Sequence, residues 1–409
     1  MGLNRTIPGL WIFGLAVCIT LACSDDAPNP AKAATDAQVP PGDDDKHACA
    51  ELEASCLENQ QICVAKPKAH CERCPGAHYT SLETHACVAL DGPAQKHEFA
   101  DFTVQPNEEV LDLCQSWTLN NDQDLWVNAV ELDQNTQSHH SNWLFVPSNQ
   151  FEGPDGVWPC KDRGYTELQA AIAGGVLYAQ STQTVHEVQK FPEGVAVRIP
   201  ARSRIIGDVH LLNVTDHVAT GHVTLGLYTI AASAVKVKLA PFHLTYHKLD
   251  IPPKLTSRFF GECDIDKASR SVIDKPLSMQ VYFILPHTHA LGSRYFVEVL
   301  GGPHDGESIF DVRGLSGESR GRYYTTPIDM AGAKGFRFGC EFDNPRNQAV
   351  HWGFGDQEMC ENLGFIASDL AFEATVSNVA SAGMDGKIPT FTGDCSVVAF
   401  RYDHEKPGG

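Results

Sequence analysis

Two pairs of histidines have a spacing that would let them bind a metal ion. His287 and His289 follow the strand-like run Val281–Leu285. Alternate residues of a strand point to the same face, so these two imidazoles can chelate one ion. His139 and His140 are adjacent, and neighbours on a regular strand face opposite sides. Shared ligation by this second pair therefore requires a bend or a bulge in the backbone.

The sequence adds a single histidine and a methionine to these candidates. His210 ends another strand-like run, and His217 and His222 are nearby rivals for the same role. Met359, one of only five methionines, lies next to Cys360 in a polar, turn-like segment, so an apolar core does not explain it. Thioether and imidazole ligands together favour copper, particularly Cu(I), over zinc or magnesium.

In this order along the chain, these residues resemble the copper type II, ascorbate-dependent monooxygenases, the family of dopamine β-monooxygenase and peptidylglycine α-hydroxylating monooxygenase. The resemblance covers roughly residues 97–400 and none of the chain before them. It is carried by a lead-in segment and four motifs, which are Leu113–Trp117, His139-His140, Val209–Leu211, Pro286–Gly292 and Glu358–Cys360.

The resemblance implies two jelly-roll domains that each bind one copper ion. The electron-transfer copper would be bound in the first domain by His139, His140 and His210. The oxygen-binding, catalytic copper would be bound in the second domain by His287, His289 and Met359. Members of the family take electrons one at a time from ascorbate, bind O2 and hydroxylate an unactivated C–H bond of a small organic substrate. A soft, neutral ligand shell stabilises Cu(I), the state that binds O2.

Six of the fourteen cysteines lie in the region of the resemblance. The resemblance implies three disulfides among them, which are Cys114–Cys160 around the adjacent histidines, Cys340–Cys360 beside Met359, and Cys263–Cys395 near the ends of the second domain. The second of these bridges would restrain the backbone beside the methionine. Closing a loop of that size contributes ~3 kcal/mol in the chain-entropy model.

The cysteine content and the N-terminus together indicate an exported protein. Fourteen cysteines in 409 residues are typical of an oxidising compartment. Residues 1–22 have the short apolar run of an export signal, and Cys23 resembles the lipid-carrying residue of a bacterial lipoprotein, with secretion as the alternative. A lipid there would attach the chain to a membrane, facing the periplasm or the cell surface. Residues 23–48, rich in Asp, Ala and Pro, are expected to form a disordered linker.

Residues 49–90 contain six cysteines and little apolar sequence, so three disulfides are expected to hold this module together. The spacing is loosely similar to that of an epidermal-growth-factor-like module. Fifteen connectivities are possible and the sequence does not choose among them. Cys71 and Cys74, with His70 and His78 nearby, leave a zinc site as the alternative.

The rest of the chain has the sequence pattern of an all-β protein. Short alternating or β-branched runs recur between clusters of Gly, Pro, Asn and Asp, which is typical of antiparallel sandwiches and jelly rolls. Ile251–Pro253 is a natural boundary, so the sequence predicts two β-domains, at residues 95–248 and 249–405. Thr166–Ala173 is a candidate for a short helix. The net charge of −20 argues against nucleic acid as a partner.

Two positions differ from the peptidylglycine enzymes and bear on the substrate. Leu285 occupies the position of an arginine that binds a substrate carboxylate, and Glu361 follows Cys360 directly. A peptide ending in glycine is therefore a poor candidate, while Glu361 would suit a cationic amine or simply be solvated. His351 is a further alternative ligand, with a structural role as the plainer interpretation.

The main alternative to an enzyme is a non-catalytic copper-binding or recognition lipoprotein that keeps the fold. Two different complete ligand sets favour the enzyme, because binding alone does not need both. A cupin-like metal enzyme is a third interpretation. Cupins place a glutamate a few residues after His-x-His, whereas the next one here is Glu298, nine residues on. The physiological reductant, the substrate and the oligomeric state are left open by the sequence.

Overall fold

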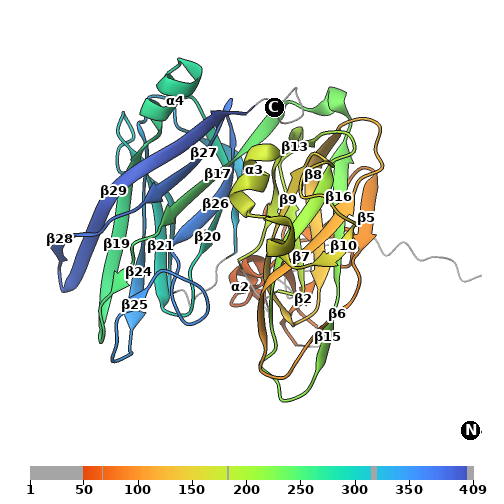
Figure 1. The fold of residues 1–409 in the computed structure, drawn as a ribbon, viewed down its shortest axis with the longest axis horizontal. Coiled ribbons are helices and arrows are strands. Elements are labelled where there is room, and N and C mark those ends of the chain that lie inside the picture. The colour runs from red at the N-terminus through yellow and green to blue at the C-terminus, as the bar shows by residue number, and fades with distance from the viewer. Residues whose placement is uncertain (1–48, 67, 182–183, 315–319, 403–409) are drawn as a thin grey trace, which may run out of the picture.

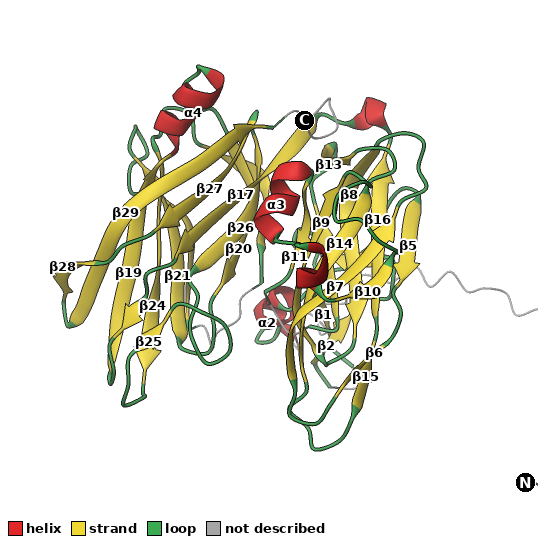
Figure 2. Ribbon diagram, in the orientation of Figure 1, coloured by secondary structure: helices red, strands yellow, loops and turns green. Residues whose placement is uncertain are grey.

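The computed structural model describes residues 49–66, 68–181, 184–314 and 320–402 (Figure 1). The expected export signal, the lipid site at Cys23 and the linker lie outside these residues. Strands dominate the described chain and the helices are short (Figure 2). It folds as two antiparallel jelly-roll β-sandwiches preceded by a small disulfide-rich module, as the sequence predicts. Within the described ranges no helix has both the length and the apolar character needed to cross a membrane.

The N-terminal module consists of one short helix and two small hairpins. Its elements are α2 (Glu53–Glu58), β1 (Gln61–Val64), β2 (His70–Arg73), β3 (His78–Thr80) and β4 (Cys87–Ala89). All six cysteines are paired, as Cys49–Cys63, Cys56–Cys71 and Cys74–Cys87. Cys71 and Cys74 therefore belong to two different disulfides, and the zinc alternative is wrong because both thiols are already used.

The first sandwich, at residues 94–230, consists of two facing sheets. One sheet has the order β10 (Gly156–Trp158), β7 (Glu109–Thr118), β14 (Arg204–Leu212), β9 (Ser138–Val146) and β11 (Gly175–Ala179). In the other, β8 (Leu125–Gln134) pairs with β12 (His186–Lys190), β13 (Val195–Ile199) and β16 (Val223–Ile230), and β16 also pairs with β5 (Ala94–Glu98). A small ladder joins β6 (Phe102–Val104) to β15 (Ala219–Gly221). The short helix α3 (Glu167–Ala173) is N-capped by Thr166, whose hydroxyl accepts a hydrogen bond from the Gln169 amide.

The second sandwich, at residues 237–401, also has two sheets, which share its last strand. One sheet has the order β22 (Ser308–Arg313), β21 (Gly292–Leu300), β24 (Gly335–Asn344), β19 (Leu255–Asp264) and β29 (Ile388–Arg401), with β28 (Ala380–Asp385) beside β29. The other has the order β23 (Arg322–Asp329), β20 (Gln280–His287), β26 (Glu361–Ala367), β17 (Val237–Tyr246), β27 (Leu370–Val376) and β29. The remaining elements are α4 (Ile265–Ile273) and the small ladder of β18 (Asp250–Ile251) and β25 (Val350–His351).

The three disulfides expected in the sandwiches are all present. Cys114 is bonded to Cys160, Cys263 to Cys395, and Cys340 to Cys360. The last bridge ties the segment after β25 to the central strand β24, so it anchors the residue next to Met359 to the core of the second sandwich.

A single strand, β17, joins the two sandwiches. Its first residues pair in parallel with β13 of the first sandwich, at Val195 and Ala196, and its later residues pair with β26 and β27 of the second. The chain therefore changes sandwich before the boundary expected at Ile251–Pro253. The hydrophobic core of the first sandwich also continues into the second, because it includes Phe283 and Phe365 of β20 and β26.

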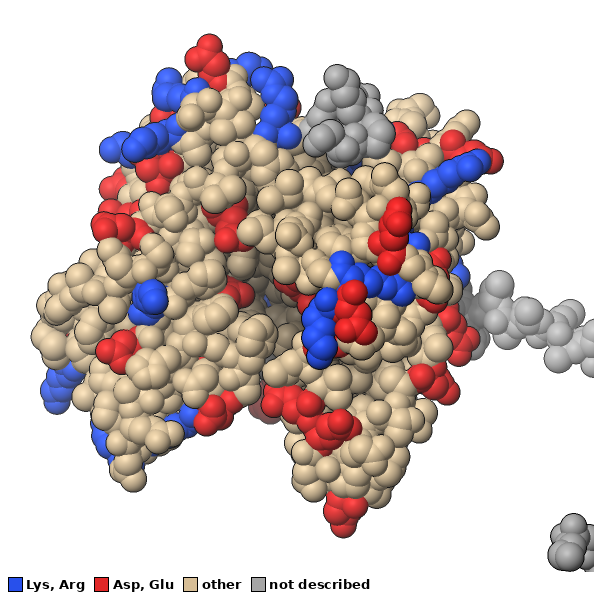
Figure 3. Space-filling model, viewed as in Figure 1, with Lys and Arg blue, Asp and Glu red and all other residues tan. Residues whose placement is uncertain are grey.

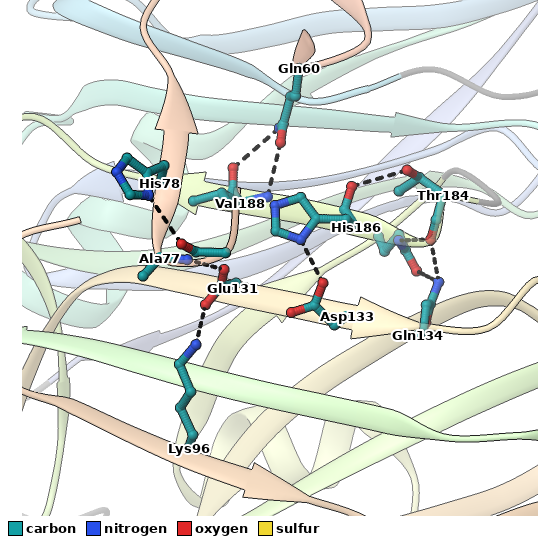
Figure 4. Close-up of polar contacts among 12 residues, drawn as sticks. Gln60, Ala77, His78, Lys96, Glu131, Asp133, Gln134, Thr184, His186 and Val188 are labelled. Atoms are coloured by element: carbon teal, nitrogen blue, oxygen red, sulfur yellow. Dashed lines mark hydrogen bonds and ion pairs between the residues drawn. The ribbon is translucent and has the colours of Figure 1, made fainter. Parts of the chain in front are cut away.

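The N-terminal module packs against the outer face of β8 and β12 (Figure 4). The Gln60 side chain accepts a hydrogen bond from the Val188 amide at 2.9 Å and donates one to its carbonyl at 3.1 Å. The Ala77 amide donates to Glu131 Oε1 at 2.7 Å, and Lys96 Nζ lies 2.7 Å from Glu131 Oε2. These contacts therefore fix the module to the first sandwich. They involve the main chain of the module at Ala77 and the main chain of the sandwich at Val188.

Replacing Glu131 with alanine should loosen this contact. The Glu131 carboxylate is buried and also accepts a hydrogen bond from the Tyr228 hydroxyl, so its removal leaves three donors without their acceptor. The Lys96 ammonium is 45% exposed and can be solvated, so the main cost is that of buried donors left without an acceptor, about 1–3 kcal/mol. Urea denaturation should show that loss in the free energy of unfolding. The variant Glu262→Ala, which removes a half-exposed carboxylate on the opposite sandwich, should lose less than about 1 kcal/mol; equal losses in the two variants would contradict the account.

Candidate metal centre

Three histidines of the first sandwich meet at the end of its inner strands. His140 on β9 lies directly opposite His210 on β14, so the two side chains share a face. The register then shifts, because Leu211 pairs with Ser138, and His139 is the extra residue of a β-bulge. The bulge turns two consecutive histidines toward one place, which is the backbone irregularity that the sequence required.

The spacing of these three side chains suits one metal ion. One ligand atom from each of His139, His140 and His210 lies within 4.8 Å of the others. His210 Nδ1 and His140 Nε2 are 3.0 Å apart. Metal–nitrogen bonds of about 2.0–2.1 Å place two ligands of a tetrahedral or square ion roughly 2.9–3.4 Å apart, so this pair already has the separation of neighbouring ligands.

The second pair of histidines lies at the end of β20 and in the turn that follows it. The His287 and His289 rings have centroids 5.1 Å apart. The turn closes at Gly292, where a Cβ atom would lie 2.2 Å from Thr288 Oγ1, so only glycine lets the Thr288 side chain fold back inside. Glycine at this position therefore keeps both histidines on one short, compact turn.

The segment that carries Met359 is held against this turn. His289 Nδ1 donates to the Gln357 carbonyl at 2.8 Å, which fixes the ring of His289. The Glu358 carboxylate accepts the His289 amide at 2.9 Å and the Leu291 amide at 2.7 Å. Met359 follows directly, is buried, and precedes the disulfide-bonded Cys360. The residues just before Met359 are thus held against the histidine turn, and Cys360 just after it is held to β24.

Three of the five histidines have their second ring nitrogen held by another group. His210 Nε2 lies 2.9 Å from Glu109 Oε1, His287 Nδ1 lies 3.0 Å from Ser181 Oγ, and His289 Nδ1 bonds the Gln357 carbonyl. Metal-binding histidines characteristically use the other nitrogen in this way, which sets the tautomer and turns the free nitrogen to the ion. No spacing rule in the sequence singles out Glu109 or Ser181, because each meets its histidine only through the tertiary fold.

The two ligand sets face each other across the junction of the sandwiches. The His140 and His287 rings have centroids 5.0 Å apart, although they come from different sandwiches. Figure 3 shows that the surface is hollowed between the two lobes and that acidic side chains lie on both sides of the hollow. Glu109, which lies 2.9 Å from His210 Nε2, has a side chain that is 36% exposed.

Burial lowers the pKa values of four of the histidines, which are His140, His210, His287 and His289. It lowers the pKa of His287 to about 3 and that of His210 to about 4, and repulsion from neighbouring imidazoles acts in the same direction. The pKa values of His140 and His289 are also lowered, mainly by burial. A metal ion needs a deprotonated imidazole, so these side chains present free lone pairs at neutral pH. Imidazole nitrogens are suitable ligands for copper.

Glu361 lies beside this centre but is occupied by other protein groups. It stands opposite His287 across β20 and β26. Its carboxylate accepts hydrogen bonds from the Thr245 hydroxyl and the Trp352 indole, both at 3.1 Å, and faces His243 at 3.6 Å. Binding of a cationic amine by Glu361 is therefore not supported, because its oxygens already have internal partners.

His243 should make the stability of the metal-free protein depend on pH. Burial acts to lower its pKa, but hydrogen bonds to Glu361 and Glu373 outweigh this and raise the pKa to about 10. The unfolded value is about 6.5, so the stabilisation is complete below that pH and is lost as the pH rises toward 10. Urea denaturation of the metal-free protein and of His243→Gln should show a difference in free energy that shrinks over this range. A difference that grows with pH would contradict the assignment.

The other candidate ligands are not part of the centre. The His351 side chain is 62% exposed and faces Asp250 at 3.6 Å. His217 is exposed and lies beside Asp216, and His222 is exposed and directly precedes β16. Of the three rivals, His210 is therefore the one that the fold brings next to His139 and His140.

A second grouping of ligand-type side chains lies under the N-terminal module. Glu131, Asp133 and His186 have ligand atoms within 4.8 Å of one another. His186 Nδ1 bonds Asp133 at 2.6 Å, and Lys96 and Ala77 bond the two Glu131 oxygens (Figure 4). The Tyr228 hydroxyl also donates to Glu131. A lysine ammonium already supplies the positive charge there, so the group serves as an ion-paired support for the module.

No protein-family profile and no curated protein matches the sequence. Among solved structures, the chain is similar to the capsid of cowpea mosaic virus empty particles, with 10% identity over 66% of this chain and 89% of that chain and a TM-score of 0.30. It is also similar to the major capsid protein P2 of bacteriophage PM2, with 8% identity over 65% of this chain and 97% of that chain and a TM-score of 0.25. At such TM-scores the likeness carries no argument about activity.

Proposed function

We propose that this protein is an exported, copper-dependent monooxygenase that hydroxylates a C–H bond of a small organic substrate with O2 and a one-electron reductant such as ascorbate. The observation that carries the proposal is the convergence of five partly buried histidines, four of them with lowered pKa values, with the segment of Met359. Two bound copper ions would supply one-electron redox cycling and O2 binding. His139, His140 and His210 would hold one ion, and His287, His289 and Met359 the other.

The protein's own groups prepare these side chains before any metal binds. Glu109 and the Gln357 carbonyl accept the outer N–H groups of His210 and His289, so the inner nitrogens are free of protons. Glu358 accepts two main-chain amides of the histidine turn and fixes it next to Met359. Desolvation lowers the pKa values of His140 and His287 and keeps both rings uncharged at neutral pH.

The two ligand sets differ in a way that fits a division of labour. The first set contains imidazoles only, and such a site can pass between Cu(II) and Cu(I) without needing contact with substrate. The second set includes a thioether, which favours the reduced ion. We assign substrate hydroxylation to the second set, and electron supply to the first.

We also propose that the protein is exported and attached to a membrane. Six disulfides among the described residues are typical of a protein exported from the cytosol. We propose that Cys23 carries a lipid that anchors the chain to a membrane. Mass spectrometry of the native protein tests this directly: a diacylated N-terminal Cys23 supports the anchor, and an unmodified N-terminus beyond that residue contradicts it.

Oxygen consumption tests the enzymatic proposal. The full-length protein is loaded with copper and mixed with ascorbate and, in turn, with a panel of amines, peptides and phenols. We expect O2 uptake that depends on copper, on ascorbate and on one class of substrate, with a hydroxylated product detected by mass spectrometry. Binding of two copper ions without turnover of any substrate would favour the alternative, a non-catalytic copper-binding lipoprotein.

A further inference from the structure

Phe354 is an exposed aromatic residue that lies close to Met359 in the sequence. It is 58% exposed, whereas every other phenylalanine, tyrosine and tryptophan among the described residues is buried or half-buried. A single exposed apolar residue is ordinary on a protein surface, but aromatic rings carry a large apolar area and usually bury most of it. The position of this residue in the fold gives its exposure a reason.

The loop that carries Phe354 follows β25 and leads directly to Met359. It is closed by main-chain hydrogen bonds. The Gly353 amide donates to the Glu358 carbonyl at 3.0 Å, and the Gln357 amide donates to the Phe354 carbonyl at 3.2 Å. Phe354 is thus held on a tight turn, five residues before the proposed copper ligand.

The tip of this loop reaches the first sandwich. Gly355 has a φ of +65°, a left-handed conformation that favours glycine. A Cβ atom at Gly355 would lie 3.8 Å from Glu109 Oε2, and Glu109 in turn lies 2.9 Å from His210 of the first ligand set. Phe354, the residue before this contact, therefore lies at the junction of the two sandwiches.

Trp352 connects Phe354 with the second ligand set. The two rings meet edge-on, with centroids 6.2 Å apart. Trp352 is half-buried, and its indole N–H donates to Glu361 at 3.1 Å. Glu361 lies opposite His287 on the neighbouring strand. The two rings therefore form an apolar surface that runs from solvent toward the histidines of the second set.

We propose that this pair of rings binds the organic substrate, and that Phe354 selects substrates that carry an aromatic ring. The inference rests on the proposed function, and it names the class of substrate on which the second ligand set acts. Aromatic rings favour each other in offset-stacked or edge-to-face contacts, beyond the burial of their area. Phe354 has no atom that ligates copper, so it is a specificity-determining residue and its loss leaves metal binding unchanged.

A matched pair of neutral ligands tests this ring preference without using turnover. Benzyl alcohol and cyclohexylmethanol have the same heavy atoms and the same hydroxyl, but only the first has an aromatic ring. Saturation-transfer NMR titrations of the full-length protein, loaded with copper and kept reduced under nitrogen, give a dissociation constant for each. We expect benzyl alcohol to bind about fivefold more tightly than cyclohexylmethanol. An equal affinity for the two alcohols, or no binding of either, would overturn the proposal.

Variants of Phe354 assign the preference to this residue. Phe354→Ala should weaken the binding of benzyl alcohol roughly tenfold and abolish the preference. Phe354→Leu keeps an apolar side chain without a ring, so it should lose the preference and retain part of the affinity. Met384→Ala is the matched control, because it removes another exposed apolar side chain, from β28, and should bind both alcohols as the parent does. An unchanged preference in Phe354→Ala would contradict the role of Phe354.

Steady-state kinetics with an aromatic substrate should show the same contact. Phe354→Ala should raise KM by roughly tenfold and change kcat by less than about twofold, because the ring binds a part of the substrate that does not react. Copper analysis should find two ions per chain in this variant, as in the parent. A fall in kcat with an unchanged KM would contradict a role in substrate selection.

The outcomes separate this inference from the proposed function. An active monooxygenase that has no preference for aromatic compounds contradicts the inference alone. A ring preference that is lost in Phe354→Ala, in a protein that hydroxylates nothing, supports the aromatic binding surface and contradicts the monooxygenase. A protein that shows neither contradicts both.

Discussion

Replacing Met359 with isoleucine should abolish substrate hydroxylation, lowering the rate of ascorbate-dependent O2 uptake by more than about 100-fold. Loss of a group that merely orients a metal ligand typically costs 10–100-fold, and here a ligand itself is removed. Isoleucine keeps an apolar side chain of similar size in a buried position, so the fold should survive. Copper content should fall by less than one ion per chain, because the first ligand set is untouched.

A second methionine provides a matched control for this change. Met384 is 64% exposed on β28, remote in the fold from the histidine turn, and Met384→Ile should retain full activity and copper content. O2 uptake and copper analysis on the same preparations give the comparison. Full activity in Met359→Ile would contradict a role for the Met359 thioether in the proposed mechanism.

Replacing His210 with alanine should have the other large effect, and of a different kind. His210 is opposite His140 and is held by Glu109, so its loss breaks the three-histidine set. About one copper ion per chain should be lost, and steady-state hydroxylation should fall by roughly 100-fold or more because the supply of electrons fails. The second ligand set is intact, so substrate should still protect the remaining ion from chelation.

The control for this variant is His217→Ala, which removes an exposed histidine from the loop that follows β14. It should bind two copper ions and turn over normally. Copper analysis, O2 uptake and the chelation rate together separate the roles of the two ligand sets. Equal and mild effects of His210→Ala and Met359→Ile would contradict the division of labour between electron supply and hydroxylation.

The sequence predicted much of the fold because the strands alternate or are β-branched throughout. The runs Leu125–Leu132, His222–Ile230 and Val281–Leu285 all lie in strands, within β8, β16 and β20 apart from the residue before β16. These patterns depend on burial of one face, which is a local property of each strand. Thr166–Ala173 was recognisable as a helix for a similar reason, since its N-cap lies within the segment itself.

The position of the domain boundary could not be predicted in the same way. Pro252 and Pro253 interrupt regular structure after β18, as two prolines in a row should, but the break falls inside the second sandwich. What joins the sandwiches is the pairing of β17 with β13 on one side and with β26 on the other. Strand pairing between residues distant in sequence leaves no local composition signal.

The candidate ligands were identified by their order and spacing, whereas the groups around them were not. Ser181, Glu109 and Glu358 each act through a tertiary contact with a histidine or with the histidine turn. Nothing in the residue type of a serine or a glutamate distinguishes such a role from an ordinary surface position. Glu358 alone had a usable signal, since it directly precedes the candidate ligand Met359.

The close approach of His140 and His287 was also beyond the sequence. Each ligand set can be assembled from strands within its own sandwich, and the resemblance implies one ion in each domain. The distance between the sets depends on how the two sandwiches pack, which is decided by apolar contacts such as Phe191 with Phe365. These phenylalanines look like ordinary core residues in the sequence.

X-ray absorption at the copper edge tests the central claim most directly, because it identifies the atoms bound to the metal. The full-length protein is loaded with copper and reduced with ascorbate, and bound copper is counted. We predict two ions per chain, nitrogen ligands typical of imidazole, and one sulfur ligand for every two coppers that is lost in Met359→Ile and kept in Met384→Ile. Failure to retain copper, or a sulfur signal that persists in Met359→Ile, would contradict the proposed metal centre.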